Sequence, residues 1–337
     1  NPAGAGEAIL TVIKNFLTYN RPSSQLKYLG NTLVKTAPLL MCALSILFAY
    51  KVGLFNIGAA GQYCMGAALS LYAALGLGWG WLPCLIAAML GGAVLGAISG
   101  LLKSYCNVNE VISGIMLNWI TLYLTNMLLT TVKEDTSPYT LVLSTTNPSA
   151  LLPSLGIGAL FDNNQYVGLA LPLSLVMALL VWVVLGRTKF GYELKATGYN
   201  KNAAKYCGMA EKRNIILSMV ISGALAGVGA GLYYLSTVAE WNPQISTALP
   251  AMGFNGISTA LLACSNPIGT IFSSLFISYI TVGGTKLSTQ YYSKEIADVI
   301  TALIIYLCAF SLLFKNKIRA LLSGKAKRVS VEKGGNA

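Results

Sequence analysis

Residues 187–213 read RTKFGYELKATGYNKNAAKYCGMAEKR, a polar stretch between two apolar segments at 166–186 and 214–235. Each flanking segment is long enough to cross a membrane as a helix. The stretch holds seven of the chain's 23 Lys and Arg residues. Basic loops between spans stay in the cytoplasm because Lys and Arg resist translocation. The sequence therefore predicts that the 187–213 loop is cytoplasmic, which fixes the orientation of every other segment.

This loop contains the signals of a short helix. Asn200 can accept a hydrogen bond from a free N–H of a first turn, and Gly208 suits a left-handed stop. We expect about two helical turns over residues 201–207, a length that is marginal in water without a docking partner. The helix either enters a groove on another protein or stays solvated and only sets topology, and the residues alone favour neither. Its small-residue face comprises Ala203, Ala204 and Cys207.

The composition is that of an all-α polytopic membrane protein. Of 337 residues, 55% are hydrophobic and 10% are charged, whereas soluble domains carry about 25% charged residues. The apolar runs are long and continuous, unlike the alternating pattern of a membrane β-barrel. The net charge of +12 follows the predicted membrane sidedness, so it does not indicate nucleic-acid binding.

The chain lacks the usual residues of catalytic and metal sites. It has no His, and its seven Cys occur singly without a CxxC spacing. Its 11 acidic residues form no pair inside an apolar segment, and there is no Walker A motif. We therefore expect no enzyme activity and no metal or cofactor bound by this chain. The remaining role is to move a solute across the membrane, or to help another protein do so.

We predict one membrane domain over residues 31–314, between an extracytoplasmic surface segment at 1–30 and a basic cytoplasmic tail at 315–337. In the first of these segments, residues 7–19 are weakly amphipathic and are expected to lie on a surface. Apolar runs of membrane-spanning length predict nine transmembrane helices. They cover residues 31–50, 56–75, 81–102, 111–131, 166–186, 214–235, 249–264, 267–284 and 296–314.

The distribution of charge agrees with this topology. Segments predicted to be cytoplasmic hold 16 basic and four acidic residues, whereas the outer segments hold seven of each. This asymmetry follows the positive-inside rule. The topology places residue 1 outside, and because no signal peptide is visible, we expect a tenth span before it.

Three stretches place uncharged polar residues in the apolar background: GLFNIGAAGQ at 53–62, NVNEVISGIMLN at 107–118 and GFNGISTALLACSNPIG at 253–269. Polar side chains are costly in lipid, so these face either a solute pathway or the neighbouring helices that they bond. The similar motifs FNIG and FNGI lie on spans of opposite direction, as in an inverted repeat with the site at its interface. The candidate pathway residues are Asn56, Gln62, Asn118, Phe254 and Asn255.

The third stretch lies on the shortest predicted span. The span at 249–264 contains Gly253 and Gly256, so we expect it to be partly unwound or re-entrant. Phe254, Trp119 and nearby Tyr residues would suit a neutral, ring-bearing solute by stacking and hydrogen bonding. They would suit a sugar almost as well.

The motifs GLFNIGAAGQ, NEVISGIMLNWI and GYELKATGYNKNAAKYCGM resemble permease subunits of bacterial ABC importers. The resemblance covers residues 30–314 and is to the branched-chain amino acid and simple-sugar permease superfamily, closest to nucleoside permeases that work with basic-membrane-protein-type lipoproteins. It implies a ten-span, type II-like importer fold in the bacterial cytoplasmic membrane, with a second permease subunit. It also implies cytoplasmic ATPase subunits that bind ATP and Mg, and an extracytoplasmic substrate-binding lipoprotein.

In such a family, the 187–213 loop couples the permease to the ATPase. The family motif often carries Glu where this chain has Ala60, which implies that this subunit is the less polar half of a heterodimer. A homodimer remains open. The resemblance and the local capping pattern together give the coupling residues Gly191, Glu193, Gly198, Asn200, Lys201, Ala203, Ala204, Lys205 and Gly208.

The expected solute is a nucleoside or a similar small polar molecule. A sugar, riboflavin or branched-chain amino acid importer of the same architecture is the alternative within this class. The alternative from another class is an ion-coupled secondary transporter, which would hold charged groups deep in the membrane. Here Glu110 and Asp298 lie near the ends of their spans, so an ATP-driven importer is favoured.

Overall fold

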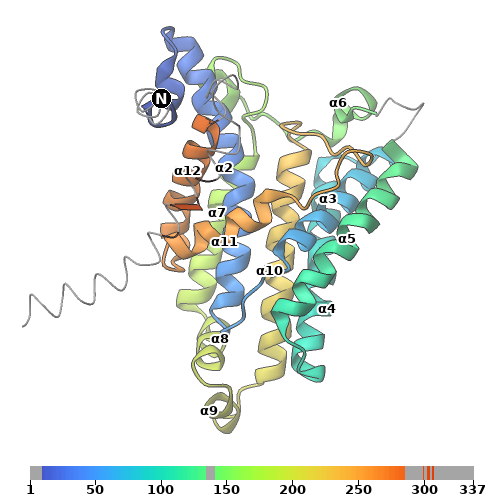
Figure 1. Ribbon diagram of the computed structural model, residues 1–337, viewed down its shortest axis with the longest axis vertical. Coiled ribbons are helices and arrows are strands. Elements are labelled where there is room, and N and C mark those ends of the chain that lie inside the picture. Colours follow the sequence, from blue (N-terminus) through green and yellow to red (C-terminus); the bar gives the residue numbers. More distant parts are fainter. Residues whose placement is uncertain (1–9, 134–140, 285–298, 300–301, 304–305, 307–337) are drawn as a thin grey trace, which may run out of the picture.

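The computed structural model describes residues 10–133, 141–284, 299, 302–303 and 306, and these residues form helices, turns and loops. Figure 1 shows the long helices side by side as one bundle, with α6 (Leu143–Thr146) near one end and α9 (Lys201–Tyr206) at the other. Six described helices are long and apolar enough to cross a membrane. They are α2 (Pro22–Tyr50), α4 (Trp81–Cys106), α5 (Glu110–Lys133), α7 (Ala170–Arg187), α10 (Glu211–Tyr234) and α12 (Pro267–Gly284).

The prediction of an all-helical membrane protein is confirmed, and six of the nine predicted spans are among these helices. The spans predicted at 56–75 and 249–264 form shorter helices, α3 (Ala59–Leu75) and α11 (Ala251–Leu262). At a rise of about 1.5 Å per residue, α3 is about 26 Å and α11 about 18 Å long, less than the ~30 Å hydrocarbon core. Apart from four isolated positions, the ninth predicted span at 296–314 lies outside the described residues and stays a prediction.

The α11 helix runs without a break through Gly253 and Gly256, so the first alternative, a partly unwound span, is wrong, and the second, a re-entrant span, stays a prediction. The two glycines instead allow close packing. A Cβ atom at Gly253 would lie 2.5 Å from the Cα of Ala60, and one at Gly256 would lie 2.8 Å from the Cβ of Cys42. These glycines therefore mark contacts of α11 with α3 and α2.

The α2 helix begins at Pro22 instead of residue 31, so part of the segment predicted to precede the membrane domain belongs to this helix. Proline in the first turn favours this start, because the N–H that it lacks has no partner there. The chain before α2 was predicted to lie on a surface, but part of it packs against α12. The Nδ2 of buried Asn15 donates to the carbonyl of Tyr279 at 2.9 Å, and the ring of Phe16 meets the Tyr279 ring edge-on.

Glycine faces bring α4 and α10 into close contact. A Cβ atom at Gly92 would overlap the carbonyl oxygen of Gly223, and a Cβ atom at Gly223 would overlap that of Gly92. A second glycine lies four residues later on the same face of each helix, at Gly96 of α4 and Gly227 of α10. In membranes, such small-residue faces allow helix backbones to approach closely and gain van der Waals contact.

The centre of the bundle is the crossing of α2 and α10, where the hydroxyl oxygens of Ser45 and Ser222 lie 3.0 Å apart. The α3 helix packs against α10, and the α11 helix packs against α2. The first turns of α3 and α11 meet at Ala60 and Gly253. Two short helices therefore flank the crossing of two long ones. The α11 helix lies in the middle part of the bundle, and α3 runs from there toward the α6 end (Figure 1).

Candidate functional site

Asn56 and Gln62 lie inside the subunit, where the crossing of α2 and α10 meets the start of α3. The Nδ2 of Asn56 donates to Gln62 Oε1 at 2.8 Å and to Ser222 Oγ at 2.7 Å. Ser222 Oγ in turn donates to the carbonyl of Ser45 at 2.7 Å. Both predicted residues are 1% exposed. These bonds matter because a buried polar group without a partner costs about 1–3 kcal/mol.

Asn118 joins α5 to the same region. Its Oδ1 accepts from the backbone N–H of Gly61 at 2.7 Å, and its Nδ2 donates to the carbonyl of Ile57 at 3.1 Å. The N–H of Gly61 is one of the first-turn donors that α3 cannot satisfy within itself. Asn118 therefore caps α3 from a neighbouring helix, and it is 1% exposed.

Three of the five predicted pathway residues, Asn56, Gln62 and Asn118, thus bond to helices of this chain. Phe254 and Asn255 lie on α11, outside this hydrogen-bonded network. Phe254 is exposed and Asn255 is half-buried. The structure therefore does not bring the five residues to one surface. Three of them form hydrogen bonds that connect helices of this chain, and the other two lie on α11, which is partly exposed.

One face of α5 is exposed and apolar. Its residues recur at intervals of three and four, which places them on one side of the helix. The rings of Trp119 and Tyr123 lie 6.3 Å apart between centroids, with an angle of 27° between their planes. Trp119 was named in the sequence analysis, but the face as a whole was not predicted. The polar residues Asn118, Thr121 and Thr125 lie on the packed side of α5, and the sequence alone does not show which side packs. The exposed residues of this face are Ile112, Met116, Trp119, Ile120, Tyr123 and Met127.

Most of the 187–213 segment is helical, and it begins with a helix that the sequence pattern did not predict. This helix, α8 (Lys189–Tyr199), is capped by Thr188, whose Oγ1 accepts from the N–H of Gly191 at 3.1 Å. The side chain of Leu194 is fully buried. The segment is therefore anchored to the bundle and is not a solvated loop along its whole length.

The predicted short helix is α9 (Lys201–Tyr206), and both of its predicted ends are confirmed. The Oδ1 of Asn200 accepts from the N–H groups of Asn202 and Ala203 at 3.0 and 3.1 Å. Gly208 follows the helix with a φ of +77°, a conformation that glycine adopts without steric cost. Local sequence signals were sufficient here because each cap acts within a few residues.

The outward surface of α9 differs from the small-residue face that was predicted. Ala204 is 3% exposed and packs inside the subunit, whereas Ala203 and Cys207 are exposed. The most exposed side chains around it are those of Tyr199, the last residue of α8, and Tyr206 of α9, each 92% exposed. They were not predicted, because which side of a short helix is buried depends on the rest of the fold. The exposed residues of this helix also include the predicted Lys201 and Lys205.

The predicted coupling residues on α8 hold this helix against the bundle. A Cβ atom at Gly191 would overlap the backbone of α7, and one at Gly198 would overlap the carbonyl oxygen of Lys51 at the end of α2. The carboxylate of Glu193 lies 3.8 Å from the ammonium of Lys189, one turn away. Within this subunit, these residues set the position of α8, and α8 sets the position of α9.

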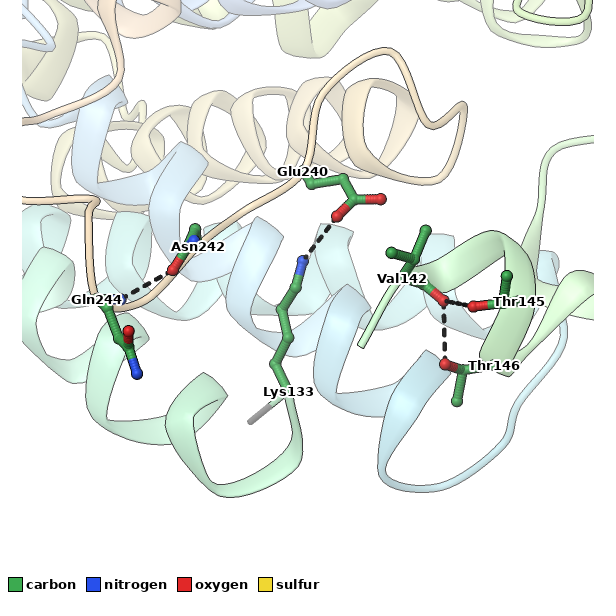
Figure 2. Close-up of polar contacts among 7 residues, drawn as sticks. All are labelled: Lys133, Val142, Thr145, Thr146, Glu240, Asn242 and Gln244. Atoms are coloured by element: carbon green, nitrogen blue, oxygen red, sulfur yellow. Dashed lines mark hydrogen bonds and ion pairs between the residues drawn. The ribbon is translucent and has the colours of Figure 1, made fainter. Parts of the chain in front are cut away.

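At the α6 end, the loop between α10 and α11 is tied to α5. Lys133 Nζ lies 3.7 Å from Glu240 Oε2, as Figure 2 shows, and Lys133 is 2% exposed. Two turns earlier on α5, Asn126 Oδ1 accepts from Trp241 Nε1 at 2.8 Å. The Nδ2 of Asn126 donates to the carbonyl of Ser246 at 2.8 Å. The loop that leads into α11 is therefore fixed to α5 at two levels.

Among the described residues, no three His, Cys, Asp or Glu side chains gather as a metal-binding group. The family model described as "Branched-chain amino acid transport system / permease component" matches residues 28–309. The chain belongs to this family. The permease is a multi-pass membrane component of an ABC transporter and not itself the ATPase, and such permeases work with ATPase and binding-protein partners. The alternative of an ion-coupled secondary transporter is therefore not supported.

Curated relatives show which permeases it resembles. The permease is 32% identical to the nucleoside ABC transporter permease protein NupB of Lactococcus lactis, over 92% of this chain and 86% of NupB. It is 30% identical to the guanosine ABC transporter permease protein NupP of Bacillus subtilis, over 87% of this chain and 84% of NupP. It is also 27% identical to the glucose ABC transporter permease protein TsgB13 of Haloferax volcanii, over 85% of this chain and 77% of TsgB13. The resemblance to nucleoside permeases is thus confirmed.

The fold of the permease is similar to that of a solved structure described as "An inward-facing conformation of a putative metal-chelate type ABC transporter", with a TM-score of 0.52 and 16% identity, over 93% of this chain and 99% of that chain. The structure of PsaBC from Streptococcus pneumoniae in complex with Fab also matches the permease, with a TM-score of 0.51 and 16% identity, over 90% of this chain and 95% of that chain. At this identity the two matches show the fold alone. They agree with the predicted type II-like permease architecture.

Proposed function

We propose that this permease forms one side of the solute pathway of an importer, along the exposed face of α5. The observation that carries this proposal is the exposed position of Tyr123 in the middle of a membrane helix. This residue lies near the middle of α5, it is 63% exposed, and no described residue bonds its hydroxyl. In lipid, an unpaired hydroxyl at that depth would be costly, and membrane Tyr residues favour the interfaces. A solute pathway or a second permease subunit would supply the missing partner.

The proposed solute is a nucleoside or a similar neutral molecule with a flat ring. Trp119 and Tyr123 offer neighbouring ring faces, and stacking of a base on an aromatic side chain contributes about 1–3 kcal/mol. Phe254 and Asn255 on α11 would add a further ring and an amide. The names of NupB and NupP support this solute class. The name of TsgB13 supports glucose as the second candidate, because aromatic faces also pack against sugar rings.

Behind this face, Asn56, Gln62 and Asn118 are proposed to hold the helices that shape the pathway. We interpret α2–α3 and α10–α11 as corresponding parts of an inverted repeat, whose axis passes near Ser45 and Ser222. The packing supports this, because α3 contacts α10 in the way that α11 contacts α2. Transporters with such repeats bind their solute at the repeat interface, near short or interrupted helices.

The α9 end of the bundle is proposed to be cytoplasmic, with α9 as the contact for an ATPase subunit. The positive-inside rule supports this orientation. Two nearly fully exposed aromatic side chains, Tyr199 and Tyr206, are the kind of residue that dominates protein interfaces. Lys201 and Lys205 would meet acidic groups at the rim of that contact. The α6 end would then face the extracytoplasmic binding protein, and the remaining apolar surface would contact lipid and a second permease.

Uptake into vesicles that hold the full complex tests the solute class. Labelled guanosine, uridine and glucose are supplied outside with ATP inside, and vesicles without ATP are the control. We expect ATP-dependent uptake of a nucleoside. Trp119→Ala should then raise KM by about fivefold to a hundredfold, because it removes one stacking face. Leu179→Ala removes an exposed apolar side chain from α7, a helix that packs on α2, α8 and α12, and it should leave KM unchanged. Uptake of glucose alone would contradict the proposed solute.

A further inference from the structure

A cavity of about 580 Å³ lies at the α9 end, between the end of α2, α8 and the turn that joins α11 to α12. Its volume is within the range of small-ligand sites. Lys51 and Lys195 line it from two directions, and Leu54 and Leu261 form part of its apolar wall. The cavity is separate from the exposed face of α5 and from the side chains of α9, although Tyr199, the last residue of α8, lines it.

The two lysines in this cavity lack an acidic partner among the described residues. The ion pairs of the described residues involve Lys103, Lys133 and Lys189 instead, and both Lys51 and Lys195 are half-buried. Burial, and then the neighbouring charge of Lys195, lowers the pKa of Lys51 below its usual value. Two cations that face one cavity repel each other, and an anion placed between them would remove that repulsion.

The other polar groups of the cavity also suit an anion with several oxygen atoms. Tyr50, Tyr199 and Ser265 contribute hydroxyl groups that can donate to such oxygens. Lysine binds phosphate groups as a point charge, without requiring one fixed geometry. Basic pockets between membrane helices near the cytoplasmic surface are known to hold anionic lipid head groups.

We propose that this cavity binds a phosphate group, supplied either by an anionic phospholipid or by a free phosphate compound. The site lies at the joint between the membrane bundle and the segment that carries α9. At this joint Gly198 of α8 touches the carbonyl of Lys51, which caps α2. A phosphate bound by Lys51 and Lys195 would therefore bridge the end of α2 and α8 and fix the base of α9. The inference does not depend on which solute the permease carries.

The assembled transporter, purified into phosphatidylcholine nanodiscs, allows a direct test. Phosphatidylglycerol is added to the discs, or inorganic phosphate to the buffer, and binding is followed by native mass spectrometry and by ³¹P NMR. Lys51→Gln combined with Lys195→Gln should weaken binding by roughly thirtyfold, since each lysine contributes about fivefold to the attraction of an anionic head group. The matched control is Lys189→Gln combined with Lys212→Gln, which removes two exposed lysines of the same segment and should change binding less than twofold.

Two further experiments identify the source of the bound phosphate group and test whether the charge of the two lysines holds it. Displacement of bound phosphatidylglycerol by millimolar phosphate supports a free phosphate compound as ligand, and lack of displacement supports the lipid. Lys51→Arg combined with Lys195→Arg keeps both charges and should keep binding. The proposal is overturned if the arginine pair binds as poorly as the glutamine pair, or if neither probe distinguishes the glutamine pair from the natural protein.

Discussion

Asn118 of α5 accepts a hydrogen bond from the backbone N–H of Gly61 at 2.7 Å, and so completes the first turn of α3. Caps of this kind usually come from the residue just before the helix. In α3 that residue is Gly58, which has no side chain to offer. The cap is therefore supplied from a different helix, 57 positions along the chain. Folding of α3 and docking of α5 are thus linked through one amide.

Asn118→Ala should lower the free energy of unfolding by about 1–3 kcal/mol, because it leaves the buried N–H of Gly61, and the partly buried carbonyl of Ile57, without this partner. Thermal unfolding of the purified complex measures the loss. Thr121→Val is the control, since that buried hydroxyl bonds to Leu117 of its own helix and should cost less. A changed KM for the solute with unchanged unfolding would instead assign Asn118 to the pathway.

Gly92→Ala should separate α4 from α10, because the added Cβ meets the carbonyl of Gly223 and neither backbone can move without disturbing the other. Overpacking of this kind costs about 1–3 kcal/mol or more. Gly186→Ala is the control: nothing lies within 4 Å of a Cβ there, and alanine favours the helix by up to about 1 kcal/mol. The two variants are compared by yield in size-exclusion chromatography and by thermal unfolding. Equal stability of both would show that the glycine contact is dispensable.

The glycines illustrate what the sequence could and could not predict. The spacing of Gly92 and Gly96 is visible in GAVLG, and that of Gly223 and Gly227 in GALAG. The chain has 34 glycines, however, and spacing alone does not say which pairs meet. For the same reason, Gly253 suggested an unwound helix, although it is a packing contact with Ala60. Glycine spacing predicts that a helix face allows close approach of another helix. Which helix packs there depends on the whole fold.

The candidate site shows the same limit. The cost of polar groups in lipid correctly predicted that Asn56, Gln62 and Asn118 avoid lipid, and all three are buried. A solute pathway and a tie between helices both satisfy that condition, so the sequence could not separate them. In the coupling segment, the caps at Asn200 and Gly208 are local and were predicted. The burial of Ala204 depends on contacts beyond its own helix and was not.

Replacing Tyr199 and Tyr206 by Ser should weaken association with the ATPase subunit. Loss of two exposed aromatic anchors at an interface typically costs about 2 kcal/mol or more, or roughly thirtyfold in affinity. Co-purification and the rate of ATP-dependent uptake measure the effect. Tyr192→Ser removes a tyrosine of α8 that is 66% exposed and does not flank α9, so it should have little effect. If both changes reduce association equally, or neither does, α9 is not the specific contact.

Breaking the ion pair of Lys133 and Glu240 should loosen the loop that leads into α11. Lys133 is 2% exposed, whereas the carboxylate side chain of Glu240 is 39% exposed. Breaking a fully buried pair costs about 3–5 kcal/mol and an exposed pair contributes about 0–1 kcal/mol, so Glu240→Gln should cost about 1–3 kcal/mol. The bonds of Asn126 remain, so the loop should loosen without the subunit unfolding.

Hydrogen exchange over residues 236–250 would detect that loosening. Glu193→Gln breaks an ion pair whose lysine is 91% exposed, and it should leave exchange in this loop unchanged. The stronger control adds Lys133→Met to Glu240→Gln. The single variant leaves a buried ammonium without its carboxylate, whereas the double variant removes both charges, so it should regain most of the lost protection. If the double variant exchanges as fast as Glu240→Gln alone, the loop depends on the carboxylate itself and not on neutralising Lys133.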